Sequence, residues 1–178
     1  MKYGLFKLLL EKTARRRMKH KKSDNFETKS VSSSLVRFAI DFKPEFVSDE
    51  VKQIAQLSLF DWFVVSLAGQ TEPVSNIIRG QIKSDGGAED CTVIGTTQRF
   101  PARASALANG TTSHALDYDD THFAYLGHPS VAIIPAAIAI GEKTNAKPEN
   151  FWNALILGLE IVTPVSYTHL TLPTKRIV

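Results

Sequence analysis

One short stretch of the chain, residues 109–122, concentrates the side chains that can carry out chemistry. If the helix predicted to begin at Pro101 continues through this stretch, its period decides which side chains share a face. The spacing i, i+3 and i+7 then places His114, Asp117 and Thr121 on one helix face. An imidazole, a carboxylate and a hydroxyl would then lie next to one another, and this combination of groups is suited to proton transfer.

A second imidazole, His128, follows at the start of the next predicted helix, where Pro129 fixes the first turn. The positive end of a helix disfavours an imidazolium, so His128 is expected to favour its neutral, proton-accepting form. A neighbouring carboxylate such as Asp117 has the opposite effect and favours the protonated imidazolium form. Together the two groups are expected to form a general acid–base pair near neutral pH. Polar groups placed between apolar helices cost free energy on burial, which favours a functional use of this segment.

Other interpretations of the same residues compete with an acid–base site. Asp119, Asp120 and His122 are expected to be solvent-facing residues near a helix end. Residues 117–120 also fit the Asp-x-Asp-Asp motif of helical terpene cyclases, although no aromatic-rich pocket is evident beside them. A metal site is chemically possible, but helical spacing would scatter its ligands, so we expect no metal. Its candidate ligands are His114, Asp117, Asp120, His122 and His128.

Hydrophobic periodicity and helix-start residues predict the elements that position these side chains. Nearly every residue from 54 to 68 is apolar, so we expect this helix to be central, buried on several sides and capped by Gly69. A short hairpin is expected within 91–100, and small residues within 102–110 indicate a close helix crossing. The absence of a repeated strand pattern predicts an all-α domain. The expected helices cover 30–41, 48–68, 73–85, a stretch from Pro101, 131–142 and a stretch from Pro148.

Composition and charge exclude several other classes of protein. The chain has 178 residues, of which 43% are hydrophobic and 22% charged, as expected for a domain with a sizeable core. It lacks an apolar run of the ~18–20 residues that span a bilayer, which excludes an integral membrane protein. The single cysteine, Cys91, cannot form an internal disulfide. The net charge of +3 comes from the ends, because residues 23–164 are acidic, and a nucleic-acid partner is therefore not expected.

The two ends are expected to lie outside the folded domain. Residues 1–29 contain a dense block of Lys and Arg and are expected to form a disordered or loosely helical arm. Residues 165–174 match the translation of a sequencing adaptor, so 165–178 is expected to be a non-native tail. We therefore expect the native domain to occupy residues 30–164 and the native protein to continue beyond Pro164.

Several motifs in order make residues 30–164 resemble the N-terminal half of the MmgE/PrpD family. This family includes 2-methylcitrate dehydratase, cis-aconitate decarboxylase and iminodisuccinate epimerase. The matching motifs are Asp61-Trp-Phe-Val-Val-Ser-Leu-Ala-Gly69, Ala106-Leu-Ala-Asn-Gly110, His114-Ala-Leu-Asp-Tyr-Asp-Asp-Thr-His122, His128-Pro-Ser-Val-Ala-Ile-Ile-Pro135 and the helix Ala154–Glu160.

The resemblance implies a cofactor-independent lyase site between a helical domain and a smaller α+β lid domain. Asp117, Thr121 and His128 fall on catalytic positions of the family. His128 would be the acid–base group nearest the reacting carbon, Asp117 its electrostatic partner, and Thr121 a hydroxyl donor to a substrate carboxylate. His114 and Ser130 are expected to bind substrate, and no metal or cofactor is implied.

The resemblance also implies a substrate class and partners. We expect a cytoplasmic, homodimeric hydro-lyase of propionate catabolism that eliminates water from a small polycarboxylate such as 2-methylcitrate. A decarboxylase-like or epimerase-like activity is left open, as is an inert helical fragment that only packs against a missing lid domain or a second copy. Chain 1–178 itself is expected to be inactive, because the family's further His, Lys and Tyr groups lie beyond Pro164. Arg99 and Arg103 alone provide too few positive charges to bind a polycarboxylate.

Overall fold

The computed structural model describes the backbone of residues 31–122 and 127–170 and the side chains of 32–122 and 127–162. Contacts divide the chain into two compact units, Met1–Ser34 and Leu35–Val178. The predicted arm at 1–29 and residues 171–178 of the predicted tail lie outside the described residues. Within the described part, six α-helices and one two-stranded hairpin confirm the predicted all-α fold. No helix among these residues is both long enough and apolar enough to cross a membrane.

The first helices begin where the sequence places their starting signals. Helix α2 covers Val31–Ile40, and a short 3-10 helix covers Pro44–Phe46. Helix α3 covers Asp49–Gly69, and the Ser48 hydroxyl oxygen accepts the Val51 N–H at 3.4 Å. This side-chain bond satisfies one of the backbone donors that a helix leaves free at its first turn, so Ser48 sets the helix start.

The later elements also follow the predicted order. Proline occupies the first turn of α4, as expected, and the two strands pair antiparallel with Cys91 opposite Phe100. The elements are α4 (Pro73–Asp85), β1 (Cys91–Thr92), β2 (Arg99–Phe100), α5 (Ala102–Ser113), α6 (Ser130–Lys143) and α7 (Pro148–Leu170).

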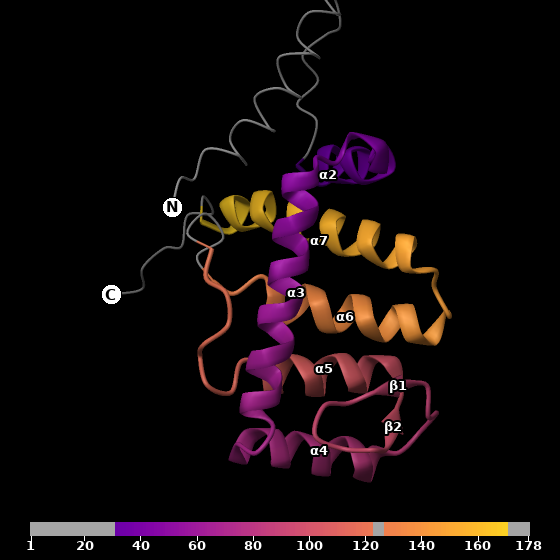
Figure 1. Ribbon diagram of the computed structural model, residues 1–178, viewed down its shortest axis with the longest axis vertical. Coiled ribbons are helices and arrows are strands. Elements are labelled where there is room, and N and C mark those ends of the chain that lie inside the picture. Colours follow the sequence, from indigo (N-terminus) through magenta and orange to yellow (C-terminus); the bar gives the residue numbers. More distant parts are fainter. Residues whose placement is uncertain (1–30, 123–126, 171–178) are drawn as a thin grey trace, which may run out of the picture. The chain divides into compact units, whose positions relative to one another are not determined.

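Helices α4, α5, α6 and α7 lie in sequence order beside one another, and α3 crosses over this layer (Figure 1). The main core lies at that crossing, where Trp62 of α3 packs with Ile134 of α6 and Leu155 of α7. A second apolar cluster joins α4, the hairpin and α5 through Ile82, Val93, Phe100 and Ala108. A third cluster, formed by Cys91, Ala102 of α5 and Ala139 of α6, packs α5 against α6, and the candidate site lies at one end of that pair.

The prediction that the apolar helix α3 is buried on several sides is wrong for the described structure. Its buried positions lie on the face that covers the layer, whereas Leu57 and Phe60 are 66% and 67% exposed. The physical reason is that α3 has packing partners on one side only among the described residues. Its exposed large apolar side chains are Ile54, Leu57, Phe60, Phe63, Val64 and Leu67.

Gly69 has a different role from the helix cap that the sequence predicts. It is the last residue of α3, and Gln70 after it remains in the right-handed helical region, so no left-handed cap is formed. A side chain at Gly69 would collide with α5, because an added Cβ would lie 2.4 Å from the Thr112 carbonyl oxygen. Gly69 therefore allows α3 and α5 to cross closely just before the candidate site begins.

Replacing Gly69 by alanine is expected to lower the free energy of unfolding by about 1–3 kcal/mol, the usual cost of overpacking a core. Urea unfolding followed by circular dichroism measures this change. Gly80→Ala is the matched control, because Gly80 lies within α4 and an added Cβ meets no heavy atom within 4 Å. That substitution is expected to stabilise the protein by ~0.5–1 kcal/mol. Equal effects at the two positions would contradict the close crossing.

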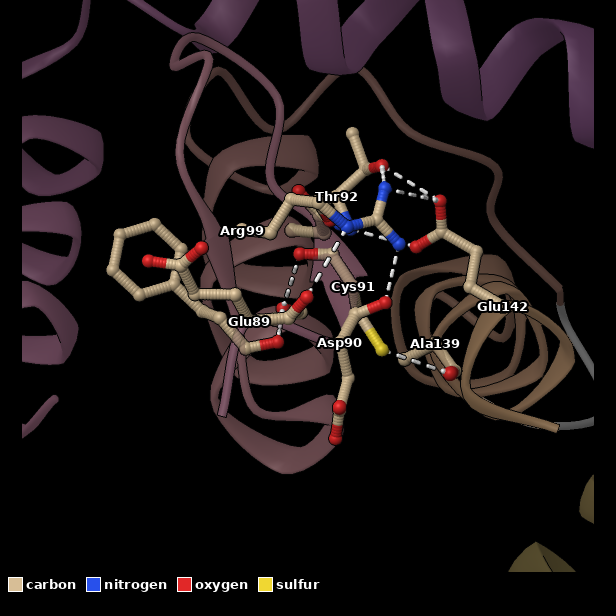
Figure 2. Close-up of polar contacts among 10 residues, drawn as sticks. Glu89, Asp90, Cys91, Thr92, Arg99, Ala139 and Glu142 are labelled. Atoms are coloured by element: carbon tan, nitrogen blue, oxygen red, sulfur yellow. Dashed lines mark hydrogen bonds and ion pairs between the residues drawn. The ribbon is translucent and has the colours of Figure 1, made fainter. Parts of the chain in front are cut away.

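A polar clasp fixes the hairpin to the C-terminal half of α6 (Figure 2). The Glu142 carboxylate accepts the Thr92 N–H and hydroxyl, both at 2.6 Å, and lies 3.8 Å from Arg99 Nη1. Arg99 also donates to the Thr92 hydroxyl and to the Glu89 and Asp90 carbonyls. Because the hairpin precedes α5 and Glu142 lies near the end of α6, Arg99 is engaged at the end of the α5–α6 pair opposite the candidate site.

Candidate active site

The condition for the predicted helix face is not met, because the helix from Pro101 does not continue through Thr121. Helix α5 ends at Ser113, with His114 as its C-cap, and the chain then turns. Asp117 has a φ of 57°, in the left-handed region that aspartate tolerates better than most residues. Its N–H donates to the His114 carbonyl oxygen at 3.1 Å. The turn replaces the expected helix face, so periodic spacing no longer explains which side chains meet.

The turn nevertheless brings the predicted acid–base residues together. His128 Nε2 lies 3.5 Å from Asp117 Oδ1, and His114 Nδ1 lies 3.9 Å from the same oxygen. The two imidazole rings have centroids 4.8 Å apart with a tilt of 59°. The Asp117 side chain is 76% exposed and that of His128 only 25%. The pair therefore lies at the protein surface with its imidazole partly enclosed.

Asp119 was expected to face solvent, and this prediction is wrong. Its side chain is fully buried and contacts both imidazoles: Oδ1 lies 2.9 Å from His114 Nδ1, and Oδ2 lies 3.4 Å from His128 Nδ1. The physical reason is the turn at Asp117, which directs the following residues back toward α6. Two histidines and a buried carboxylate thus form a compact cluster with the exposed Asp117.

Asp120 ties the loop to the start of α6. Its carboxylate accepts the Ser130 N–H at 3.1 Å and the Ser130 hydroxyl at 2.6 Å. A carboxylate at a helix N-terminus satisfies free backbone donors and interacts favourably with the helix dipole. Ser130 is buried and its hydroxyl is already donated to Asp120, so the structure shows it as an anchor of the loop. Its contact with substrate stays a prediction.

The remaining predicted catalytic residue is Thr121. It is exposed and follows Asp120 directly. The next residue, His122, donates its N–H to the Gly127 carbonyl oxygen at 2.9 Å, which closes the loop between α5 and α6. The structure therefore gathers His114, Asp117 and His128 and adds Asp119, which the sequence spacing did not single out.

Asp61 of α3 is a further acid of this region. Partial burial, followed by the negative charges of Asp120 and Asp119, raises the pKa of Asp61. The only sequence signal for it is its position in the Asp61–Gly69 motif. Three carboxylates near one another make this part of the molecule strongly acidic, so an anionic substrate needs additional cations.

The raised pKa of Asp61 has a defined effect on stability. Its contribution to folding is fully present below the ordinary aspartate pKa and is lost as pH rises through the raised value. We therefore expect Asp61→Asn to increase the free energy of unfolding at pH 7. This gain should disappear below about pH 3, where the wild-type carboxyl is also neutral. Urea unfolding at both pH values checks the sign, and a gain that persists in acid would show an effect of packing rather than of charge.

The cluster also has the spacing of a metal site, which corrects the expectation that its ligands would be scattered. One ligand atom from each of His114, Asp117, Asp119 and His128 lies within 4.8 Å of the others. Imidazole and carboxylate ligands suit several divalent ions. Two of the ligands expected from the sequence, Asp120 and His122, are not in this group. The Asp-x-Asp-Asp interpretation is also disfavoured, because Asp119 is buried against histidines and Asp120 is bound to Ser130.

The fold and the cluster define a helical domain that carries a group of imidazole and carboxylate side chains around the loop between two packed helices. A family model described as the MmgE/PrpD N-terminal domain matches residues 33–168. The chain belongs to the MmgE/PrpD family, as the sequence motifs indicated.

The chain is also similar to a curated fungal protein, the cis-aconitate decarboxylase-like protein oryM of Aspergillus oryzae. The two are 28% identical over 145 residues, which cover 78% of this chain and 30% of the relative. The chain thus spans less than a third of the relative's length. The family includes lyases, among them dehydratases and decarboxylases.

Proposed function

We propose that this chain is the N-terminal helical part of a lyase that acts on small polycarboxylic acids without a cofactor. The observation that carries the proposal is the pairing of His128 Nε2 with the exposed Asp117 carboxylate at 3.5 Å, beside a second imidazole. Family membership and the decarboxylase-like relative support the reaction class.

In the proposed reaction, His128 Nε2 accepts a proton from the carbon beside a substrate carboxylate. The electrons of the broken C–H bond form a C=C bond, and the hydroxyl group on the adjacent carbon leaves as water after it is protonated. Asp117 stabilises the imidazolium that forms on His128. His114 is the nearest second imidazole and is assigned the proton donor to the leaving hydroxyl. Thr121 is assigned a hydrogen bond to a substrate carboxylate, and Ser130 holds the loop in place.

The described residues alone do not neutralise such a substrate. Arg99 contacts Glu142, and the region of the cluster contains the acids Asp61, Asp119 and Asp120. Cations that recognise carboxylates must therefore come from elsewhere, and we propose that a further lid domain and a second copy of the protein supply or position them. Isolated chain 1–178 is accordingly expected to be inactive.

The assay that tests this proposal uses the product of the complete reading frame, here called the complete enzyme, beside chain 1–178. We expect the complete enzyme to convert 2-methylcitrate to an unsaturated acid, measured by absorbance of the new double bond. Release of CO2 from cis-aconitate is the second candidate activity, which the name of the relative favours. Failure to process either acid would contradict the proposed function. Turnover by chain 1–178 alone would show that the site needs no further domain.

Removal of metal ions is expected to leave the activity of the complete enzyme unchanged within about twofold, because His128 and Asp117 suffice for proton transfer. The enzyme is treated with EDTA, passed through a desalting column and assayed at once. A large loss that Zn²⁺ or Fe²⁺ restores would contradict a metal-free site. It would instead indicate that the four side chains of the cluster bind a metal ion that takes part in the reaction.

A further inference from the structure

We propose that Asp119 is the positioning residue of this site, a single buried carboxylate that fixes the orientation and tautomer of both imidazoles. The inference rests on the proposed function, because it explains how the acid–base groups are held. It assigns a role to a residue that neither the motif spacing nor the family resemblance selected.

The contacts of Asp119 are concentrated on the two Nδ1 atoms. Its carboxylate oxygens lie 2.9 and 3.2 Å from His114 Nδ1, and Oδ2 lies 3.4 Å from His128 Nδ1. The backbone carbonyl oxygen of Asp119 also lies 3.3 Å from His128 Nδ1. An ionised carboxylate and a carbonyl only accept hydrogen bonds. Both Nδ1 atoms must therefore carry a proton, whether each ring is neutral or cationic.

Burial makes this arrangement more than a surface contact. The Asp119 side chain has no exposed area, while the side chains of His114 and His128 are 48% and 25% exposed. A buried carboxylate is costly unless hydrogen bonds compensate for the lost water. Within the described part of the chain, the carboxylate makes its hydrogen-bond and ion-pair contacts with the two imidazoles. The buried carboxylate of Asp119 thus holds each imidazole ring at its Nδ1 atom.

The fixed tautomer has a direct chemical consequence. When Nδ1 carries the proton, Nε2 is the atom of each ring that can take up or release one. For His128 this atom lies 3.5 Å from the exposed Asp117 carboxylate, whose negative charge stabilises the proton that Nε2 takes up. The same logic applies in other enzymes, where a buried acid holds a histidine in the tautomer that accepts a proton. Here one acid serves two rings at once.

The test is a two-bond ¹H–¹⁵N correlation spectrum of the histidine rings in chain 1–178, which distinguishes protonated from unprotonated ring nitrogens. We expect both His114 and His128 to show a protonated Nδ1 in the wild type. In Asp119→Asn, at least one ring should change to the Nε2–H tautomer, because an NH2 group replaces one of the two carboxylate oxygens and can only donate to an unprotonated Nδ1. Asp85→Asn, at the exposed end of α4, is the matched control and should leave both rings unchanged.

An unprotonated Nδ1 on either wild-type ring would overturn the proposal, and so would unchanged tautomers in a folded Asp119→Asn protein. The wild-type spectrum decides the matter even where that variant fails to fold. In the complete enzyme, Asp119→Asn is expected to lower kcat about 10²–10⁴-fold with KM within threefold. The spectrum needs no substrate. A wrong substrate class would therefore leave the predicted tautomers unchanged and show only as a lack of turnover, whereas a wrong role for Asp119 would show in the spectrum itself.

Discussion

Replacing His128 by glutamine is expected to lower kcat of the complete enzyme about 10²–10⁴-fold, the usual contribution of a general acid or base. Glutamine keeps much of the size and polarity of the side chain but cannot take up a proton. KM should change little, because the imidazole acts on the reacting proton rather than on the substrate carboxylates. The measurement is steady-state turnover of whichever polycarboxylate the wild-type enzyme accepts.

His122→Gln provides the matched control for that experiment. His122 lies in the same loop, but it is not one of the four residues whose ligand atoms converge at the cluster. We expect this variant to keep kcat within about threefold of wild type, since it removes an imidazole that takes no part in the proposed proton transfer. A His128→Gln enzyme with unchanged kcat would remove His128 from the acid–base role, whatever the control shows.

Replacing Trp62 by alanine is expected to lower the free energy of unfolding by about 3–5 kcal/mol, as for other large buried aromatic residues. Trp62 is 1% exposed and joins α3 to α6 and α7 through Ile134 and Leu155. Its removal leaves a cavity at the crossing that the layer cannot close without moving α3. The midpoint of thermal unfolding should fall by roughly 6–20 °C for a domain of this size.

Phe60→Ala is the control for Trp62, because it removes another large aromatic side chain two positions earlier on the same helix. Phe60 is 67% exposed, so its loss is expected to change the free energy of unfolding of chain 1–178 by no more than about 0.5 kcal/mol. A larger effect for Phe60 than for Trp62 would contradict the assignment of the buried face of α3.

Local signals in the sequence were sufficient to predict where most of the helices begin. Ser48, Pro73 and Pro148 set helix starts through capping or a fixed φ angle, and these effects depend on neighbouring residues alone. The hairpin of 91–100 followed from short β-type runs around a turn. The extent of burial around α3 did not follow, because an apolar helix looks the same in sequence whether its outer face is covered or exposed.

The candidate site was predicted by composition more successfully than by geometry. The residue types of the segment 109–130 indicated acid–base chemistry, and the structure does bring Asp117 and His128 together. The spacing argument failed because α5 ends at Ser113 and the chain then turns, with Asp117 in the left-handed region. The burial of Asp119 depends on that turn and on the packing of α6, which are tertiary effects that no local pattern encodes.

The most direct measurement of the central claim follows the substrate proton itself. The complete enzyme is incubated with 2-methylcitrate in D2O, and ¹H NMR records the C–H signal that is lost and the product signal that appears. We predict that the wild-type enzyme removes the proton beside a carboxylate, and that His128→Gln leaves that signal unchanged over the same period. Loss of the proton at the wild-type rate in the variant would contradict the assignment of His128 as the group that accepts it.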